Sequence, residues 1–180
     1  MDWTWFNAPP AWEARGDRIV MRSGPQTDFW RKTHDGGIRH TGHFYYRRVL
    51  GEFQMDARLS GQYTDLYDQA GFMLRADEST WLKCGIEFVN GVQHVSAVVT
   101  HDYSDWSVIP LPQNPPTLWL RLVRTGKAVE LFYALDGTAY TMFRQTFLTS
   151  APDIEAGLMC AAPIGDGFEV IFEGVSLRGL

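Results

Sequence analysis

Apolar and polar residues alternate along most of this chain, and turn-forming dipeptides separate the alternating runs. A period of two is typical of β-strands, and no window carries a sustained apolar stripe with helical spacing. Asn90-Gly91 is the strongest hairpin signal, because both residues accept a positive φ. Thr125-Gly126 and Asp136-Gly137 mark two further hairpins. The pattern therefore predicts an all-β fold of antiparallel strands, arranged as a sandwich or barrel.

The rest of the chain follows the same pattern. Two strand-like runs, 154–162 and 167–179, flank a connection from Pro163 to Asp166. Pro115-Pro116 marks another connection, because proline cannot donate to a central ladder. The sequence carries no internal repeat, low-complexity stretch or linker. Residues 1–180 are accordingly predicted to form a single domain.

The turn at Asn90-Gly91 sets the register of the hairpin that it joins, so that Glu87 faces His94. Because side chains alternate between faces, the hairpin can be sorted residue by residue. One face is apolar except for Gln93, and carries Leu82, Cys84, Ile86, Phe88, Val95, Ala97 and Val99. The other face carries Trp81, Lys83, Gly85, Glu87, His94, Ser96 and Thr100. A wrong register would mix the two sets, so the sorting supports the predicted hairpin.

The preceding run, 69–75, divides in the same way and extends the polar face if it pairs with 80–89. The predicted open face then gathers Gln69, Arg75, Trp81, Lys83, Glu87, His94 and Ser96. Gly71 and Gly85 leave space between these side chains. A ring for stacking beside charged hydrogen-bonding groups is the chemistry that recognises sugars. The alternative is an ordinary solvated sheet face, whose polar residues need no function.

Aromatic residues make up 14% of the chain and include seven tryptophans, more than a core of this size needs. Trp is rarely buried completely, so some rings are expected on a surface that something else covers. Asp105 and Trp106 are predicted to form a rim beside the open face, and Trp30 is predicted to form the opposite rim. The alternative for each Trp is packing at the edge of the core. Between Glu87 and His94 we expect a cross-strand ion pair or hydrogen bond.

Composition excludes several classes of partner. The net charge of −5 comes without any run of Lys or Arg, so neither nucleic acid nor an anionic membrane is an expected partner. Cys84 and Cys160 lie in apolar runs and are predicted to be buried free thiols. The N-terminal segment lacks the basic start and unbroken apolar stretch of a signal peptide, which predicts a cytoplasmic protein.

Residues 68–108 resemble the regulation-of-enolase family of concanavalin-A-like jelly-roll domains, and the opening segment 3–34 and the closing runs 155–163 and 168–177 do so as well. The most specific piece is W-x-K-x-x-x-E, here Trp81, Lys83 and Glu87, together with S-D-W-S from Ser104 to Ser107. The resemblance implies a two-sheet antiparallel jelly roll with a concave face, as in lectins and laminarinase-like glucanases. It implies no particular activity, because the family has none established and analogy of fold is not function.

Two kinds of chemistry find little support in the sequence. Glycoside hydrolysis needs two carboxyls that flank the bond, and Glu87 stands alone on its strand, with Glu155 or Asp105 as candidate partners from other elements. His34, His40 and His43 match no standard metal spacing. We expect no cofactor and no catalytic residue, and a structural calcium ion stays open without a compact Asp/Asn cluster that demands one.

The hypothesis favoured by the sequence is a carbohydrate- or small-polyol-binding module that uses the open concave face, with a saccharide or sugar-derived small molecule as partner. One alternative is a regulatory or protein-interaction domain linked to carbohydrate metabolism, with a homodimer or another protein as partner. A sugar-active hydrolase is the third, weakened by the missing second carboxylate.

Overall fold

The computed structural model describes residues 2–180, and every regular element in that range is a β-strand. In chain order the strands are β1 (Thr4–Phe6), β2 (Ala11–Arg15), β3 (Arg18–Arg22), β4 (Phe29–Arg31), β5 (Ile38–His40), β6 (His43–Leu50), β7 (Phe53–Gly61), β8 (Gln69–Arg75), β9 (Thr80–Val89), β10 (Val92–His101), β11 (Tyr103–Leu111), β12 (Leu118–Thr125), β13 (Ala128–Ala134), β14 (Thr141–Phe147), β15 (Asp153–Ala161) and β16 (Glu169–Gly179). Residues 2–180 contain no helix that is long and apolar enough to cross a membrane.

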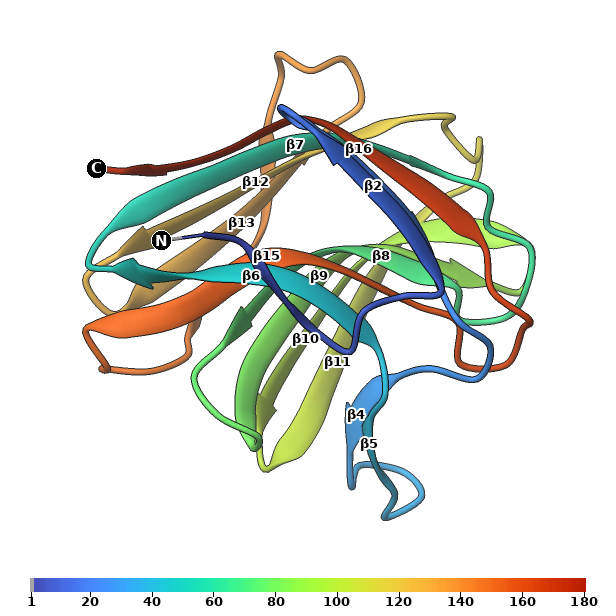
Figure 1. The fold of residues 1–180 in the computed structure, drawn as a ribbon, viewed down its shortest axis with the longest axis horizontal. Coiled ribbons are helices and arrows are strands. Elements are labelled where there is room, and N and C mark those ends of the chain that lie inside the picture. The colour runs from blue at the N-terminus through green and yellow to red at the C-terminus, as the bar shows by residue number, and fades with distance from the viewer. Residues whose placement is uncertain (1) are drawn as a thin grey trace.

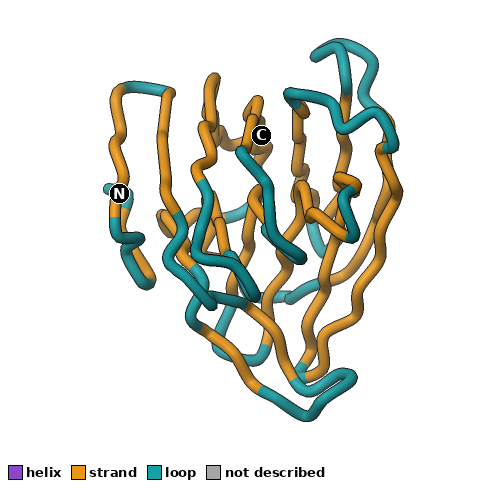
Figure 2. The backbone as a smooth tube through the Cα atoms, turned by 90° about the vertical axis from the view of Figure 1, so that its right-hand side faces the viewer, coloured by secondary structure: helices purple, strands orange, loops and turns teal. Residues whose placement is uncertain are grey.

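Two seven-stranded antiparallel sheets form the two layers of a sandwich (Figure 1). Sheet A has the order β1-β6-β15-β8-β9-β10-β11, and sheet B has the order β14-β13-β12-β7-β16-β3-β2. Most loops gather at the two ends of the strands (Figure 2). The strands β4 and β5 form a separate hairpin that projects from the sandwich. The predicted all-β, two-sheet antiparallel sandwich is thus confirmed.

The register predicted from Asn90-Gly91 is also confirmed. Glu87 pairs with His94 and Gly85 with Ser96, and β8 adds to β9 on its other side. The apolar face of this hairpin turns inward to a continuous core shared by both sheets, in which Leu82, Ile86, Val95 and Ala97 are buried. Cys84 and Cys160 lie in the same core as free thiols, and burial raises the pKa of Cys84 to about 12.

The two closing runs are both strands, but they do not pair with each other. β15 lies in sheet A between β6 and β8, and β16 lies in sheet B between β7 and β3. The connection between them, around Pro163 to Asp166, therefore passes from one sheet to the other.

An aromatic clasp closes one side of the sandwich, and we define it as Trp3, Trp5, Trp12 and Tyr45. Trp5 lies on β1 of sheet A and Trp12 on β2 of sheet B, and their ring centroids are 5.2 Å apart. Tyr45, on β6, contacts both rings, at 4.7 Å from Trp5 and 5.8 Å from Trp12. Trp3 stacks on Tyr45 at 5.1 Å. Two of the seven tryptophans, Trp5 and Trp12, thus join the two sheets.

The opposite side of the sandwich, between the edge strands β11 and β14, is held by fewer contacts. Arg144 of β14 donates from Nη1 to Ser107 Oγ at 2.7 Å, and its Nη2 lies 3.6 Å from Asp105 Oδ2. His101 stacks on Phe147 with ring centroids 6.0 Å apart. Several apolar side chains remain exposed along these two strands, namely Tyr103, Trp106, Val108, Ile109, Met142 and Phe147.

Candidate functional site

The outer face of sheet A, turned away from sheet B, is the face that the sequence predicts to be open. Residues 23–42, which we call the flap, connect β3 to β6 and cover one end of this face. Phe29 of the flap packs against Trp81, with ring centroids 6.2 Å apart, and Trp81 is 0% exposed. Both belong to a second apolar cluster made of Phe29, Phe44, Met73, Trp81, Val98, Met159 and Ala161.

The prediction that Trp81 is an open stacking ring is therefore wrong. Its side chain lies on the predicted face, but the flap brings its own apolar residues onto that face. Burial removes apolar surface of both partners from water, and this stabilises the fold by roughly 25 cal/mol for each Å² buried. The tryptophan that was to stack on a ligand stacks on the protein's own Phe29 instead.

Lys83 ties the flap to the sheet. Its Nζ donates to the Phe29 carbonyl oxygen at 2.6 Å and lies 3.4 Å from Asp28 Oδ1. The side chain is buried, and a buried ammonium is tolerated only when it has partners of this kind. Asp28 in turn lies 3.5 Å from the Gln69 side-chain nitrogen, so the flap supplies one carboxylate to two residues of the predicted site.

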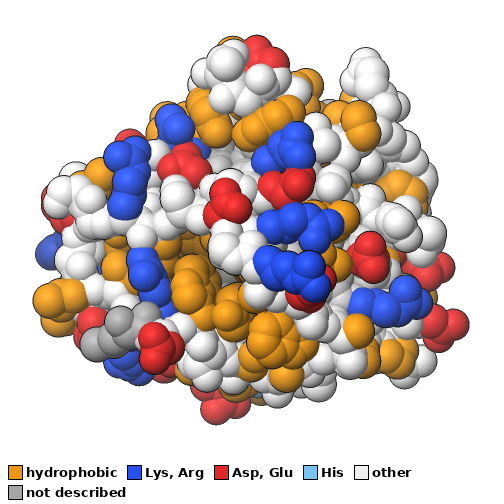
Figure 3. All heavy atoms as spheres, turned by 45° about the horizontal axis from the view of Figure 1, so that its top comes forward, with side chains coloured by type: hydrophobic (Ala, Val, Ile, Leu, Met, Phe, Trp, Pro, Cys, Tyr) orange, Lys and Arg blue, Asp and Glu red, His pale blue; other side chains and the backbone are white. Residues whose placement is uncertain are grey.

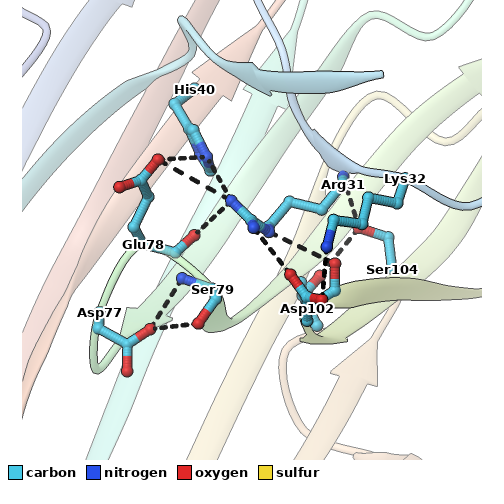
Figure 4. A network of polar contacts seen from close by, with 9 residues as sticks. Arg31, Lys32, His40, Asp77, Glu78, Ser79, Asp102 and Ser104 are labelled. Carbon is cyan, nitrogen blue, oxygen red and sulfur yellow. Dashed lines mark hydrogen bonds and ion pairs between the residues drawn. The ribbon is translucent and has the colours of Figure 1, made fainter. Parts of the chain in front are cut away.

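A polar latch pins the β4–β5 hairpin of the flap to the rim of sheet A (Figure 4). Arg31 Nη2 donates to Asp102 Oδ1 at 2.8 Å, and the backbone N–H of Arg31 donates to Ser104 Oγ at 3.0 Å. On the other side, Arg31 Nη1 lies 3.0 Å from His40 Nε2, which lies 3.4 Å from Glu78 Oε1. The guanidinium is thus shared between the two loops that flank the end of the sheet.

Charges in this latch are matched. Lys32 Nζ lies 2.5 Å from the second Asp102 oxygen, and hydrogen bonds from Lys32 and Arg31 hold the pKa of the Asp102 carboxyl below its usual range. Burial lowers the pKa of His40, which favours its neutral form beside Arg31. The latch therefore joins a carboxylate to two cationic side chains of the flap.

The flap leaves a small pocket open towards the Asn90-Gly91 turn. It is lined by Gln69, Ala70, Lys83, Cys84, Gly85, Ile86, Glu87, Ser96 and Met159. Its cavity volume is about 10 Å³, which is room for about one water molecule. Gly85 lies in its floor, and a Cβ on Gly85, at φ +153°, would lie 2.1 Å from the Ala70 carbonyl oxygen. Glycine is required here because any side chain would collide with the neighbouring strand.

Glu87 is the central polar group of this pocket. Its Oε2 accepts a hydrogen bond from Ser96 Oγ at 2.6 Å and another from the Trp106 indole N–H at 2.8 Å. Hydrogen bonds to a carboxylate are the stronger kind, and two of them fix its orientation. Trp106 is 40% exposed, and the Tyr67 ring meets it edge-on with centroids 6.3 Å apart. These two rings form an aromatic rim beside the pocket.

The structure brings together five of the ten predicted site residues. Gln69, Lys83, Glu87 and Ser96 line the pocket, and Trp106 forms its rim, as expected. Trp81 lies under the flap. The remaining four, Arg75, His94, Asp105 and Trp30, do not line the pocket.

Three of these four residues have partners elsewhere, and His94 is described below. Arg75 donates to Glu155 Oε2 at 2.8 Å, and its guanidinium lies over the Phe6 ring. Asp105 lies on the other face of β11 from Trp106, near Arg144. Trp30 lies on the flap and donates from its indole to the Thr33 carbonyl at 2.7 Å, so it is not a rim of the pocket.

The expected contact between Glu87 and His94 is wrong as well. The two residues face each other in the register, but His94 Nδ1 lies 2.9 Å from the Val92 carbonyl oxygen. The Glu87 carboxylate turns instead towards Ser96 and Trp106. A hydroxyl and an indole N–H satisfy the carboxylate on the sheet face.

Two residues of the site were not predicted, Asp28 and Tyr67. Both lie in irregular segments, and Tyr67 has a positive φ of 69°. Alternation of residues identifies faces of strands, and it says nothing of loops that fold back over them. Their only signal in the sequence is proximity to predicted strands, which is too weak to find them.

The acids considered as partners for Glu87 have other roles. Glu155 is ion-paired with Arg75 and with Arg48, whose Nη2 lies 3.4 Å from Glu155 Oε1. Asp105 pairs with Arg144. The arrangement in the pocket is therefore one fixed carboxylate, one ammonium and one amide around a narrow opening, which is suited to holding a hydroxyl-bearing group.

Comparison with known proteins assigns the chain to a family. A family model described as "Protein of unknown function (DUF1349)" matches residues 5–179. The chain belongs to this family. The Saccharomyces cerevisiae protein named "Regulation of enolase protein 1" is 32% identical over 174 residues, which cover 97% of this chain and 88% of the yeast protein. The resemblance inferred from the sequence is thereby confirmed.

Solved structures extend the likeness. A functionally unknown protein from Saccharomyces cerevisiae superposes with a TM-score of 0.94 at 31% identity, covering 99% of this chain and 96% of that one. The GH43 BlXynB protein from Bacillus licheniformis gives 0.77 at 14% identity, covering 99% of this chain and 37% of that one. The carbohydrate-binding module CBM66 from Bacillus subtilis gives 0.62 at 11%, covering 98% and 95%. At such identities the last two show the fold alone.

Proposed function

We propose that this protein is a saccharide-binding module whose site is the Glu87 pocket with its aromatic rim. The observation that carries the proposal is the Glu87 carboxylate, fixed by Ser96 and by Trp106, with the same Trp106 ring half-exposed beside it. An apolar sugar face packs on an indole while hydroxyls meet fixed polar groups. The carbohydrate-binding module among the structural neighbours adds support at the level of the fold.

The size of the pocket defines how a sugar binds there. A cavity of about 10 Å³ admits one hydroxyl or hydroxymethyl group, and not a whole ring. Such a group meets the Glu87 carboxylate, the Lys83 ammonium and the Gln69 amide, while the ring lies outside against Trp106 and Tyr67. Each such contact contributes modestly, so we expect weak binding, with Kd on the order of 1 mM.

The test is a thermal-shift and calorimetry screen against neutral sugars, sugar phosphates and oligosaccharides. Trp106→Ala removes the exposed ring and one donor to Glu87, and we expect it to abolish binding while the fold survives. Tyr103→Ala is the matched control, because Tyr103 is exposed on the opposite face of the same strand. A ligand stabilises the fold by RT ln(1 + [L]/Kd), so even weak binding is visible at high concentration.

Three results are informative. Binding lost in Trp106→Ala and kept in Tyr103→Ala supports the proposal. Binding that both variants keep places the site elsewhere and contradicts it. Absence of any shift in a well-folded wild-type protein contradicts saccharide binding altogether.

A second candidate function is protein recognition by the edge strand β11. Ile109 and Val108 are exposed on this strand, and unpaired edge strands pair readily with other chains. The name of the yeast relative points to a regulatory role. Sedimentation velocity with purified enolase tests this: a complex that Ile109→Lys abolishes supports it, and independent sedimentation of the two proteins contradicts it.

A further inference from the structure

A second hollow lies on the opposite side of the molecule, on the outer face of sheet B. Figure 3 shows this face, where hydrophobic side chains lie among Lys, Arg, Asp and Glu. The groove is lined by Asp56, Ala57, Arg58, Trp119, Tyr140, Glu173 and Gly174. Its cavity volume is about 340 Å³, within the range of about 300–1,000 Å³ typical of small-molecule sites. It is much larger than the pocket at Glu87.

Strand register explains why these residues meet. Trp119 of β12 pairs with Arg58 of β7, and Arg58 pairs with Glu173 of β16. These three side chains form one row across three neighbouring strands, about 10 Å long at the usual strand spacing. In the adjacent row, Arg121 pairs with Asp56.

A β-bulge opens one end of the groove. The pairing of β16 with β7 shifts between Glu173 and Ser176, and Gly174 there has a φ of +62°. No atom lies within 4 Å of the position that a Cβ on Gly174 would take. Bulges bend a strand and interrupt the row of side chains, and they often occur next to functional sites.

Aromatic rings line the other end. The loop between β13 and β14 folds over sheet B, and a Cβ on Gly137 would lie 2.9 Å from the Trp119 ring. Tyr140 follows in the same loop, and the Arg121 guanidinium lies over its ring at 4.1 Å from the centroid. Trp119 and Tyr140 are each partly exposed. Trp119 and Tyr140 thus both contribute a partly exposed aromatic ring to the groove.

The charged groups of the groove neutralise one another. Arg121 Nε donates to Asp56 Oδ1 at 2.7 Å, and Arg58 pairs with Glu173. An anionic or cationic ligand would have to break one of these pairs. A neutral ligand with hydroxyls keeps them, because guanidinium and carboxylate groups retain donors and acceptors for hydroxyl groups.

We propose that this groove is a second, independent saccharide-binding site, which takes a pyranose ring of a neutral oligosaccharide. The apolar face of the ring packs on Trp119 and Tyr140, and its hydroxyls bind the row formed by Arg58 and Glu173. The proposal does not rest on the pocket at Glu87.

The test is fluorine NMR of protein labelled with 5-fluorotryptophan, titrated with cellotetraose, xylotetraose and maltotetraose. Each Trp gives its own resonance, so Trp119 reports on the groove and Trp106 on the pocket. We expect the Trp119 resonance to shift with at least one of the three sugars. Tyr140→Ala is expected to raise the Kd at this site about 10-fold, and Trp106→Ala is expected to leave it unchanged.

The outcomes separate this proposal from the first. A Trp119 shift that Tyr140→Ala weakens and Trp106→Ala preserves supports the groove. A shift of Trp106 alone overturns the groove and keeps the pocket, and a shift of Trp119 alone does the reverse. If Tyr140→Ala fails to fold, Glu173→Gln replaces it, because its side chain is partly exposed in the same row. No Trp119 shift with any of the three sugars overturns the inference.

Discussion

At the scale of single residues, Lys83 and Glu87 show what the sequence reveals and what it does not. Both were assigned to the outer face of their strand from alternation alone, and both lie there. The partners of Lys83 lie on the flap, which no strand pattern identifies. Ser96 and Trp106 are both predicted site residues, but alternation does not predict that they donate hydrogen bonds to Glu87. A strand pattern gives the direction of a side chain, whereas its hydrogen bonds depend on elements far away in the chain.

Lys83→Met is expected to destabilise the protein by about 2 kcal/mol, because it leaves the Phe29 carbonyl without its donor and removes the ammonium beside the Asp28 carboxylate. Urea unfolding monitored by Trp fluorescence measures the change. Lys127→Met, in the turn between β12 and β13 and exposed, is the control and should change stability by less than about 0.5 kcal/mol. Equal stability of Lys83→Met and wild type would show that the buried ammonium is not a tie.

His43 is expected to make stability depend on pH. Its Nε2 accepts a hydrogen bond from the Gly24 N–H at 2.9 Å, and burial lowers its pKa from 6.5. Because the unfolded chain keeps a pKa of about 6.5, it binds more protons than the folded protein below that pH. Stability is therefore fully present above about pH 6.5 and falls as the pH drops through the folded pKa.

Urea midpoints measured from pH 7.5 down to about pH 5 test this dependence. His43→Gln keeps an acceptor but does not titrate, and we expect its midpoint to fall less steeply than that of wild type. The pKa of His40 is lowered as well, so the urea midpoint of His43→Gln should still fall somewhat with decreasing pH. Identical slopes in the two proteins would assign the effect to other groups.

At the scale of elements, strands and turns were predictable and the flap was not. Asn90-Gly91 determines the register of β9 and β10, because a two-residue turn leaves one alignment. The flap, residues 23–42, contains two three-residue strands and many turn residues, so no period identifies where it lies. The sequence therefore does not predict that the flap covers Trp81, and the open part of the predicted face is only the pocket at Glu87.

Asp102→Asn is expected to loosen the flap without unfolding the sandwich. It removes the charge that Arg31 and Lys32 share at the latch, whereas the apolar contacts of Phe29 remain. Hydrogen exchange should show several-fold faster exchange at the Lys32 amide, which pairs with Gly37 in the hairpin, and no change in β9.

Asp35→Asn is the matched control for this variant, because Asp35 pairs with Arg39 within the same hairpin. Its hairpin amides should exchange much more slowly than those of Asp102→Asn. Unchanged exchange in Asp102→Asn would mean that apolar burial alone holds the flap.

At the scale of the whole molecule, the two sheets depend on one shared core. Backbone hydrogen bonds between strands run within each sheet, and side chains such as Phe72 of sheet A and Phe172 of sheet B lie in the core between them. The sandwich class followed from the number of hairpins and their alternating faces. The placement of β15 and β16 in different sheets did not, because a short connection between two strands fits a hairpin as well as a crossing.

Phe172→Ala is expected to cost about 3–5 kcal/mol, because it leaves a cavity where a fully buried ring was. Both sheets should lose protection together in hydrogen exchange, since neither has another partner for its inner face. Leu135→Ala, at an exposed site, is the control and should be near neutral. Loss of protection in sheet B alone would show that the sheets are independent units.

The aromatic clasp gives the molecule a mechanical asymmetry. On one side of the sandwich, aromatic rings from both sheets pack against one another. On the side between β11 and β14, the contacts are mainly the hydrogen bond from Arg144 and the stacking of His101 on Phe147. A force that pulls the two sheets apart should therefore separate them first between β11 and β14, while the side with the clasp stays joined. In a pulling experiment, handles on β11 and β14 should part at low force, and handles on β1 and β2 at high force.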